Sequence, residues 1–169
     1  TKREIRSLTL SALAPKRGEL LWDVGAGSGS VAIEWMLADA SLRAIAIEAR
    51  ADRAARVSRN ASAFGVPGLL IIEGSAPDAL AGLEAPDAIF IGGGGSTDGV
   101  LDACIAALKP GGRLVANAVT LETESDLIAR HAELGGALTR IAVSRADPVG
   151  SKIGWRPAMP VTQWGWEKS

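Results

Sequence analysis

The sequence predicts an α/β domain built on a mostly parallel sheet of seven strands. Between residues 19 and 134, short apolar runs alternate with helical segments, and a parallel return between two strands needs a crossover long enough to hold a helix. The chain has 169 residues and 47% hydrophobic content, which fits one ordinary domain with a substantial core. The last two apolar runs have no helix between them, so we expect an antiparallel hairpin at one edge of the sheet.

The first half of the chain supplies an opening helix and two strand–helix units. The run E-L-L-W-D-V is short, apolar and followed at once by glycines, as a buried parallel strand should be. The next strand, R-A-I-A-I-E, ends in an acid, and the basic, alanine-rich helix after it is closed by Gly65. The expected elements are helices at residues 2–13, 28–38 and 50–64, and strands at residues 19–24 and 43–48.

The second half continues the alternation and then changes character. G-L-L-I-I-E and D-A-I-F-I-G-G are typical of buried strands, K-P-G-G stops the following helix, and two glycines end the last one. A stretch rich in glycine and proline at residues 147–157 is interpreted as a loop between the final two strands. The expected elements are strands at residues 68–73, 87–93, 113–118, 138–144 and 160–167, and helices at residues 76–83, 98–108 and 122–134.

Composition and charge exclude several functions. The formal net charge is -1 with both signs interspersed, so no field recruits nucleic acid or an anionic membrane. The chain has no long apolar span and no leader, and we expect a cytoplasmic protein. One cysteine, Cys104, and one histidine leave no basis for a metal site, which favours chemistry supplied by a cofactor. The chain begins at Thr1 without methionine, so we expect one domain excised from a longer protein.

The strongest motif is the glycine loop D-V-G-A-G-S-G-S after the first strand. Its alternate glycines let the backbone turn tightly and approach a ligand without a Cβ in the way. Free N–H groups at the start of the next helix can receive a carboxylate or phosphate. A nicotinamide loop would have the pattern G-x-G-x-x-G, which places Ser30 where the third glycine belongs. An oxidoreductase, and a scaffold whose glycines only pack a helix on a strand, remain alternatives.

The spacing G-x-G-x-G, with an acid two residues earlier, resembles the loop of class I, Rossmann-like methyltransferases that bind S-adenosylmethionine. The resemblance implies that Asp23 orients the ammonium of the cofactor while the loop contacts its carboxylate. Glu48, at the tip of the second strand, is suited to accept hydrogen bonds from both ribose hydroxyls. Ser75 and Ala76 would border the adenine, with Ser75 or Asp78 as acceptor for its amino group. The loop residues concerned are Gly25, Ala26, Gly27, Ser28 and Gly29.

Nearly the whole chain resembles one family, the decarboxylating precorrin carbon-15 methyltransferases of cobalamin biosynthesis. The resemblance is carried by T-K-R-E-I-R, W-D-V-G-A-G-S-G-S, G-S-A-P, D-A-I-F-I-G-G-G, L-K-P-G-G-R-L-V-A-N-A-V-T-L-E and G-W-R-P-A-M-P-V-T-Q-W. It implies methylation of a precorrin-6B or precorrin-7 type ring at carbon 15, with loss of carbon dioxide from the acetate on carbon 12. It also implies a homotetramer, in some members fused to a carbon-5 methyltransferase domain, and adds Thr1 to the cofactor contacts. A methyltransferase acting on another small molecule is the alternative.

Candidate substrate contacts follow from this resemblance. The four consecutive glycines after the fourth strand are well placed to let a large, flat ring reach the cofactor, with Gly92 beside the cofactor and Gly93 and Gly94 beside the ring. Guanidinium and ammonium groups would bind the carboxylates of the ring, and the polar residues beyond the fifth strand are candidate catalytic groups. The cationic candidates are Lys2, Arg3, Lys152 and Arg156, and the polar candidates are Asn117, Thr120 and Glu122. Trp155, Trp164 and Trp166 could stack on the ring, but core or interface packing is the favoured role for the last two.

Overall fold

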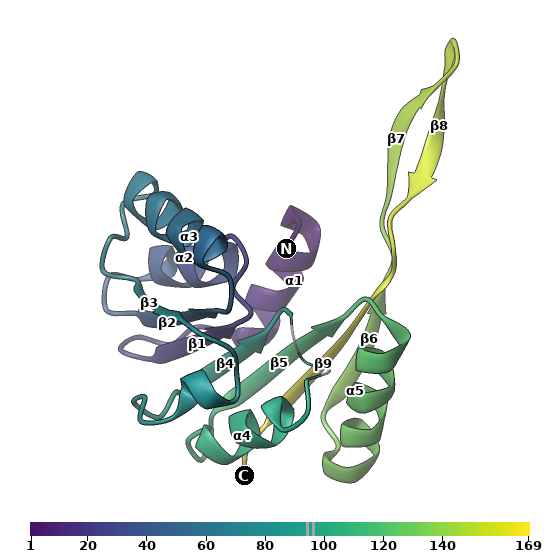
Figure 1. Cartoon of the computed structure of the whole chain (residues 1–169). Helices are drawn as coiled ribbons and strands as arrows, with labels where there is room; N and C mark the ends of the chain where they lie inside the picture. Colours follow the sequence, from purple (N-terminus) through teal and green to yellow (C-terminus); the bar gives the residue numbers. More distant parts are fainter. Residues whose placement is uncertain (94, 96) are drawn as a thin grey trace.

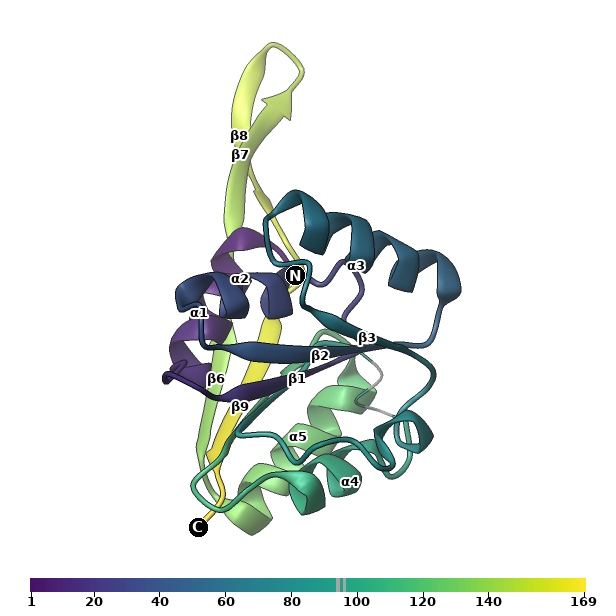
Figure 2. The ribbon, with the colours of Figure 1, turned by 90° about the vertical axis from the view of Figure 1, so that its left-hand side faces the viewer.

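The chain folds into three layers, a sheet with helices on both faces (Figures 1 and 2). The computed structural model describes residues 1–93, 95 and 97–169. The helices are α1 Arg3–Leu13, α2 Ser30–Ala38, α3 Ala51–Ala63, α4 Val100–Ala107 and α5 Leu121–Leu134, with the 3-10 turn η1 Asp78–Leu80. The strands are β1 Leu20–Val24, β2 Arg43–Glu48, β3 Leu70–Glu73, β4 Ala88–Ile91, β5 Arg113–Ala118, β6 Ala137–Ile141, β7 Ser144–Val149, β8 Lys152–Pro157 and β9 Val161–Glu167.

The main sheet has seven strands in the order β3-β2-β1-β4-β5-β9-β6. The first five are parallel, while β9 lies between β5 and β6 and runs antiparallel to both. The predicted mostly parallel sheet with an antiparallel pair at one edge is therefore confirmed. The strand order reverses between β1 and β4, and in open parallel sheets ligands bind outside the carboxyl ends of the strands at this point.

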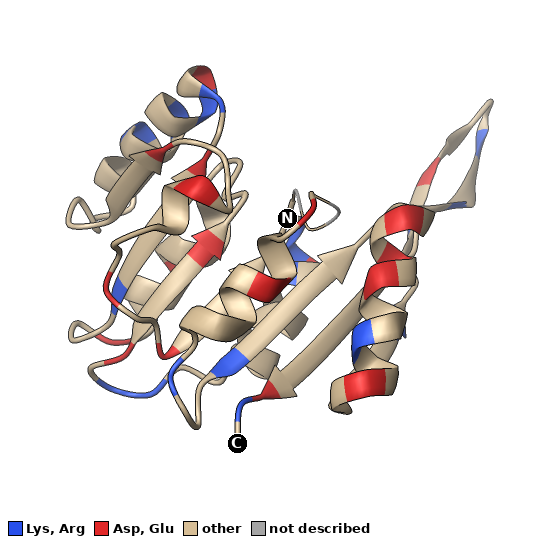
Figure 3. Cartoon of the chain, turned by 60° about the horizontal axis from the view of Figure 1, so that its bottom comes forward, with Lys and Arg blue, Asp and Glu red and all other residues tan. Residues whose placement is uncertain are grey.

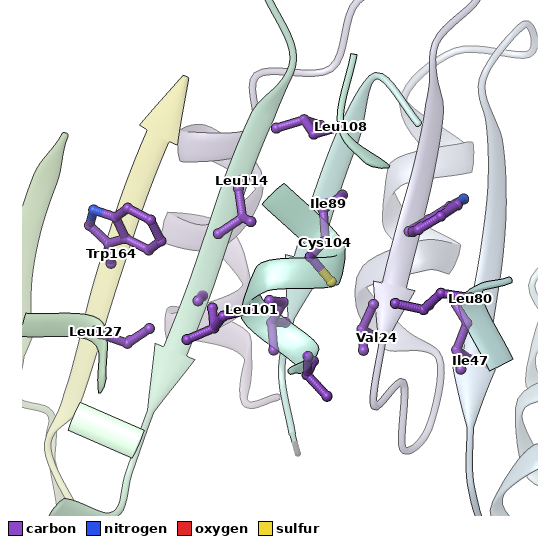
Figure 4. Packing of buried hydrophobic residues seen from close by; sticks show 14 of the residues in the cluster. Val24, Ile47, Leu80, Ile89, Leu101, Cys104, Leu108, Leu114, Leu127 and Trp164 are labelled. Atoms are coloured by element: carbon purple, nitrogen blue, oxygen red, sulfur yellow. The ribbon is translucent and has the colours of Figure 1, made fainter. Parts of the chain in front are cut away.

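Side chains alternate between two cores, one on each face of the sheet. Leu20, Trp22 and Val24 of β1 face the core beneath α4 and α5, which also contains Cys104 (Figure 4). Leu21 faces the other core, with α1, α2 and α3. Because every residue of β1 is buried, the strand is apolar throughout except for Asp23, whose charge must serve a purpose other than solvation.

Residues 147–157 do not form the predicted loop. β7 and β8 pair as a separate two-stranded antiparallel sheet, which projects from the body of the molecule and is here named the arm, residues 144–157 (Figure 1). Gly150 has a φ of +61° at the turn between the strands. The strands of the arm pack against neither core, so their sequence does not alternate between apolar and polar residues. Without that pattern, the glycines and prolines of the segment indicated a loop.

A buried arginine fixes α1 against the sheet. Arg113, at the start of β5, donates from Nε to the carbonyl of Leu13 at 2.8 Å and from Nη1 to Oε1 of Glu19, also at 2.8 Å. Elsewhere charged residues lie mostly on helices and connections, with both signs interspersed (Figure 3). In the described part of the chain, no helix combines the length and apolar character that crossing a bilayer requires.

Candidate active site

Two cavities open at the carboxyl ends of the parallel strands, and the consecutive residues Gly92 and Gly93 line one cavity each. The first, of about 200 Å³, is named the loop cavity; the second, of about 250 Å³ and next to the arm, is named the arm cavity. The loop cavity is lined by Val24, Gly25, Ile47, Glu48, Ala49, Arg53, Gly74, Ser75, Ala76, Gly93 and Thr97. The arm cavity is lined by Thr1, Lys2, Glu4, Ile5, Gly92, Asn117, Val119, Ile141, Val143, Arg145, Ala158, Met159 and Val161.

The glycine loop makes the tight turn that its sequence predicts, and its first glycine contacts the backbone of another loop. Gly25 has a φ of +72°, and a Cβ at this position would overlap the carbonyl oxygen of Gly93. A Cβ on Gly29 would lie 2.6 Å from Cγ1 of Val57 on α3. Two of the three glycines are therefore needed for contacts within the protein, in addition to any approach of a ligand.

Most amides of the loop already have acceptors within the protein. Those of Gly25 and Ala26 donate to the carbonyl of Ile47 at 2.9 and 3.1 Å, and that of Gly29 donates to Ala26 at 2.9 Å. Among the described residues, the amides of Ser28 and Ser30, at the start of α2, have no protein acceptor. Together with the amide of Val31 in the first turn of α2, which likewise has no acceptor among the described residues, these two are the N–H groups available to an anion at this helix N-terminus.

Asp23 lies buried behind the loop with one carboxylate oxygen unpaired. Its side chain is 1% exposed, and Oδ2 accepts a hydrogen bond from the amide of Ala32 at 3.1 Å. Oδ1 has no hydrogen-bond partner within the described residues. Burial raises the pKa of Asp23 to about 7, because desolvation disfavours the charged form. An unpaired buried carboxylate is costly, and a cationic group would satisfy it.

Glu48 ties the tip of β2 to the glycine loop. Its Oε2 accepts from the amide of Gly27 at 2.8 Å, and its Oε1 accepts from the amide of Arg50 at 3.0 Å. Each oxygen keeps further acceptor capacity, and the residue lines the loop cavity. Arg53, in the first turn of α3, lines the same cavity and was missed from sequence. The signal that could have found Arg53 is its position: a basic residue in the first turn of the helix that follows the strand ending in Glu48.

The predicted adenine border is at the loop cavity, whereas the predicted glycine tract is divided between the two cavities. Ser75 and Ala76 line the loop cavity, and Asp78 does not. Gly92, expected beside the cofactor, lines the arm cavity, and Gly93, expected beside the ring, lines the loop cavity. Gly94, a predicted substrate contact, lies outside the described residues. Two consecutive residues, Gly92 and Gly93, therefore line different cavities.

The arm cavity brings together residues from both ends of the chain. Thr1, Lys2 and Asn117 were predicted and line it, although Thr1 was expected at the cofactor. Arg145, at the base of the arm, was missed; it lines the cavity and pairs with Glu4. It was missed because its segment gave no strand pattern, so nothing placed it near the amino-terminal helix.

Several predicted contacts lie away from both cavities. Thr120 is the N-cap of α5, where its Oγ1 accepts from the amide of Thr123 at 3.4 Å, and Glu122 is exposed in the first turn. Arg3 is exposed and lines neither cavity. On the arm, Arg156 lies 3.6 Å from Asp147, and Lys152 is exposed close to the turn. Thr120 and Glu122 were misplaced because the sequence did not predict the helix cap. Arg156 and Lys152 were misplaced because it did not predict the arm.

The aromatic and sulfur side chains have structural roles in the body of the protein. Trp164 is fully buried and stacks on Trp166 with ring centroids 6.1 Å apart, so the favoured packing role is confirmed. Trp155 is 78% exposed on the arm. Cys104 is buried, and desolvation raises the pKa of its thiol to about 12, which makes it a poor nucleophile.

Comparison with known proteins places this geometry in a family. Residues 1–168 match the family model described as precorrin methyltransferase domain. The precorrin-6Y C(5,15)-methyltransferase (decarboxylating) of Sinorhizobium is 67% identical over 168 residues, which are 99% of this chain and 41% of that protein. The cobalt-precorrin-6B C(15)-methyltransferase (decarboxylating) of Salmonella typhimurium is 34% identical over 165 residues, which are 95% of this chain and 85% of that protein.

Solved structures agree in fold. The C-terminal domain of precorrin-6Y C5,15-methyltransferase from Rhodobacter capsulatus is 50% identical and superposes with a TM-score of 0.93 over 99% of this chain and 90% of that one. An S-adenosylmethionine-dependent O-methyltransferase from Thermotoga maritima, 20% identical, has a TM-score of 0.73 over 98% of this chain and 66% of that one. The fold is thus that of class I methyltransferases, and the chain spans about two fifths of the longer Sinorhizobium relative. By sequence and by structure, this chain belongs to the family of precorrin methyltransferase domains.

Proposed function

We propose that this chain methylates a precorrin-6B or precorrin-7 type ring at carbon 15, using S-adenosylmethionine, and removes carbon dioxide from the acetate on carbon 12. The observation that carries the proposal is that two cavities are lined by the consecutive residues Gly92 and Gly93. A cofactor on one side of this tract and a ring on the other would have their reacting atoms at a shared boundary. The names of the Sinorhizobium and Salmonella relatives support the same reaction.

The loop cavity and the glycine loop beside it fit S-adenosylmethionine, with Asp23, Ser28 and Ser30 outside the lining of the cavity itself. The unpaired Oδ1 of Asp23 suits its ammonium, and the amides of Ser28 and Ser30 suit its carboxylate. Glu48 would accept from the ribose hydroxyls, and Ser75 and Ala76 would border the adenine. When bound, the cofactor supplies an electrophilic methyl group on sulfur. The contribution of the protein is to hold and orient it against bare backbone.

The arm cavity fits the edge of a tetrapyrrole that carries carboxylates. Apolar side chains such as Ile141, Val143 and Met159 line most of it, while Lys2 and Arg145 supply positive charge. Arg145 can exchange its contact with Glu4 for a substrate carboxylate, which a guanidinium binds bidentately. We therefore propose Arg145, rather than Arg3 or Arg156, as the main carboxylate contact.

Positioning supplies most of the catalytic effect in this proposal. Transfer of a methyl group to an electron-rich ring carbon needs little acid–base help, and correct placement contributes up to roughly 7 to 11 kcal/mol. The conjugated ring can accept the electron pair released when carbon dioxide leaves. The chain then has to exclude water, hold the ring carboxylates and fix which carbon faces the methyl group.

We also propose that the chain acts as part of a larger assembly. Its share of the Sinorhizobium relative, 41% of that length, is consistent with a single domain fused to a carbon-5 methyltransferase. Val149, Ile153 and Trp155 are exposed on the arm, and an isolated two-stranded hairpin is marginally stable in water. Contact between arms in a homotetramer would cover these side chains. The cytoplasmic location expected from the sequence stays a prediction.

The reaction can be tested by product mass. The chain is incubated with enzymatically made precorrin-7 and S-adenosylmethionine, and we expect a gain of one methyl group and a loss of one carbon dioxide. An unchanged mass would refute the proposed reaction. Calorimetry with S-adenosylhomocysteine tests the cofactor separately: binding that Glu48→Ala abolishes is expected, and binding of NADH instead would favour an oxidoreductase.

The carboxylate contact has its own test. Arg145→Ala should raise KM for the ring by about tenfold, since a hydrogen-bonded charge contributes about 1.5–3 kcal/mol, with the affinity for S-adenosylhomocysteine unchanged. Arg156→Ala is the matched control on the same arm, because Arg156 lines neither cavity. Equal effects of the two substitutions would refute the assignment to Arg145.

A further inference from the structure

Three polar side chains from distant parts of the sequence form a triangle of hydrogen bonds beside the arm cavity. Nδ2 of Asn117, on β5, donates to Oγ1 of Thr9, on α1, at 3.0 Å. Nε2 of Gln163, on β9, donates to the same Oγ1 at 3.1 Å and to Oδ1 of Asn117 at 2.9 Å. Thr9 is 0% exposed and Gln163 is 7% exposed, so the triangle links three elements in the interior of the protein.

Only one orientation of the two amides supplies a hydrogen to all three contacts. Turning the amide of Asn117 alone would set two NH₂ groups against each other. Turning that of Gln163 alone would set its oxygen against the oxygen of Asn117. If both were turned, the single hydroxyl hydrogen of Thr9 would have to serve two acceptors, and one contact would lack a hydrogen. The triangle therefore fixes which end of the Asn117 amide is the donor.

This arrangement leaves Asn117 with unused hydrogen-bonding capacity. One hydrogen on Nδ2 and one lone pair on Oδ1 remain outside the triangle. Asn117 lines the arm cavity and is half-buried, whereas Thr9 and Gln163 do not line it. Asn117 is therefore the member of the triangle through which Thr9 and Gln163 reach a molecule in that cavity.

Stability alone gives little reason for such a triangle. Val115, two residues earlier on the same face of β5, is a buried apolar residue in the core, and an apolar side chain could continue this surface. Buried polar networks add little net stability compared with apolar packing, but they impose a definite orientation. Orientation matters most where a ligand must be held.

We propose that Thr9 and Gln163 are positioning residues, which fix the amide of Asn117 so that its free N–H is directed to a polar group at the edge of the substrate ring. The inference rests on the proposed function and extends it to two residues that the sequence analysis did not single out. In this role, Asn117 selects which ring carbon faces the boundary at Gly92. Thr9 and Gln163 ensure that the amide offers a donor at that point instead of an acceptor.

The test compares isosteric variants of the triangle with a matched control. Thr9→Val removes the hydroxyl at nearly constant volume, Gln163→Met removes the amide, and Thr9→Ser keeps the hydroxyl. Thr162→Val is the control: Thr162 is a neighbour of Gln163 on β9, is also buried, and its Oγ1 has no hydrogen-bond partner in the described part of the chain. Each variant is assayed for folding by circular dichroism, for affinity to S-adenosylhomocysteine, for kcat and KM with enzymatically made precorrin-7, and for product composition.

We expect Thr9→Val and Gln163→Met to lower kcat by about tenfold or more, because a misplaced substrate reacts slowly. They should also raise the share of product that is decarboxylated but unmethylated or methylated at another carbon. Thr9→Ser should stay within about twofold of the original chain, Thr162→Val should be unchanged, and all four should bind S-adenosylhomocysteine equally. Altered product composition is the readout that a merely structural role would not produce.

The unfavourable outcomes are distinguishable. If the original chain does not convert the ring at all, the proposed function is refuted and this inference falls with it. If the original chain is active and Thr9→Val and Gln163→Met behave like Thr162→Val, only the inference is refuted. If one of the two triangle variants fails to fold, the other decides, and loss of folding in both would show that the triangle is a folding element and overturn the proposal.

Discussion

Replacing Asp23 by asparagine removes a buried negative charge and keeps the size of the side chain. An amide oxygen can still accept the hydrogen bond from the amide of Ala32, which Oδ2 of Asp23 accepts at 3.1 Å. The substitution therefore isolates the charge itself. In the proposed site that charge has two opposite effects, because it is unfavourable in the empty protein and favourable when the ammonium of the cofactor is present.

The sign of the stability effect follows from the raised pKa. Between pH 3.8 and about 7 the folded protein holds a proton on Asp23 that the unfolded chain has released. The stability of the original chain from this source is greatest below pH 3.8, falls as pH rises through this window, and is constant above it. Two pH units within the window, from pH 5 to pH 7, correspond to about 3 kcal/mol at about 1.36 kcal/mol per unit. The asparagine variant has no such dependence, because its side chain does not titrate.

The assay is urea unfolding of both proteins at several pH values, with calorimetry of S-adenosylhomocysteine binding alongside. The stability of Asp23→Asn relative to the original chain should increase by about 3 kcal/mol from pH 5 to pH 8. The comparison cancels every other titrating group. Cofactor affinity should change in the opposite direction, with the variant binding about 10- to 100-fold more weakly at pH 8, since a hydrogen bond to a charged group contributes about 1.5–3 kcal/mol.

Two results would refute this reasoning separately. A stability difference that is the same at pH 5 and pH 8 would mean that the carboxyl of Asp23 does not titrate near neutral pH. Equal affinities of the two proteins for S-adenosylhomocysteine would mean that the ammonium is held elsewhere, whatever the stability data show.

Three further predictions concern the loop, the arm and the buried ion pair. Gly25→Ala should lower the free energy of unfolding by more than about 2 kcal/mol and abolish S-adenosylhomocysteine binding, because the new Cβ would overlap a backbone carbonyl. The control is Gly18→Ala, at a similar φ but with open space around it, which should lower the free energy of unfolding by only about 1–2 kcal/mol. Equal losses of stability in the two variants would exclude the overlap. Trp155→Lys should reduce the particle mass in analytical ultracentrifugation without changing cofactor affinity. Leu121→Lys, which replaces an equally exposed apolar residue outside the arm, should leave the particle mass unchanged. A particle mass that Trp155→Lys does not reduce would argue against contacts between arms. Arg113→Met should destabilise the chain by about 3–5 kcal/mol, since it removes the cationic partner of the largely buried Glu19 carboxylate. A loss below about 1 kcal/mol in urea unfolding would contradict this role.

The elements that were predicted correctly are those whose burial leaves a local pattern. β1, β2, β4 and β5 lie in the middle of the sheet, so nearly all of their residues are buried and most are apolar, and the sequence alone located them. The glycine loop is equally local, because alternate glycines mark left-handed backbone directly. Asp23 and Glu48 could be singled out because each is an acid within or at the end of an otherwise apolar strand.

What the tertiary structure alone decided involves residues far apart in the chain or outside the core. The arm was missed because its strands pack on neither core and carry no burial pattern, and Arg145 was missed with it. Asn117 was found from the sequence, but Thr9 and Gln163 were not. Thr9 is 108 residues from Asn117, and Gln163 is 154 residues from Thr9. Hydrogen bonds between such distant side chains leave no periodicity in the sequence, because they depend on the order of strands in the sheet, and that order is set only when the whole chain has packed.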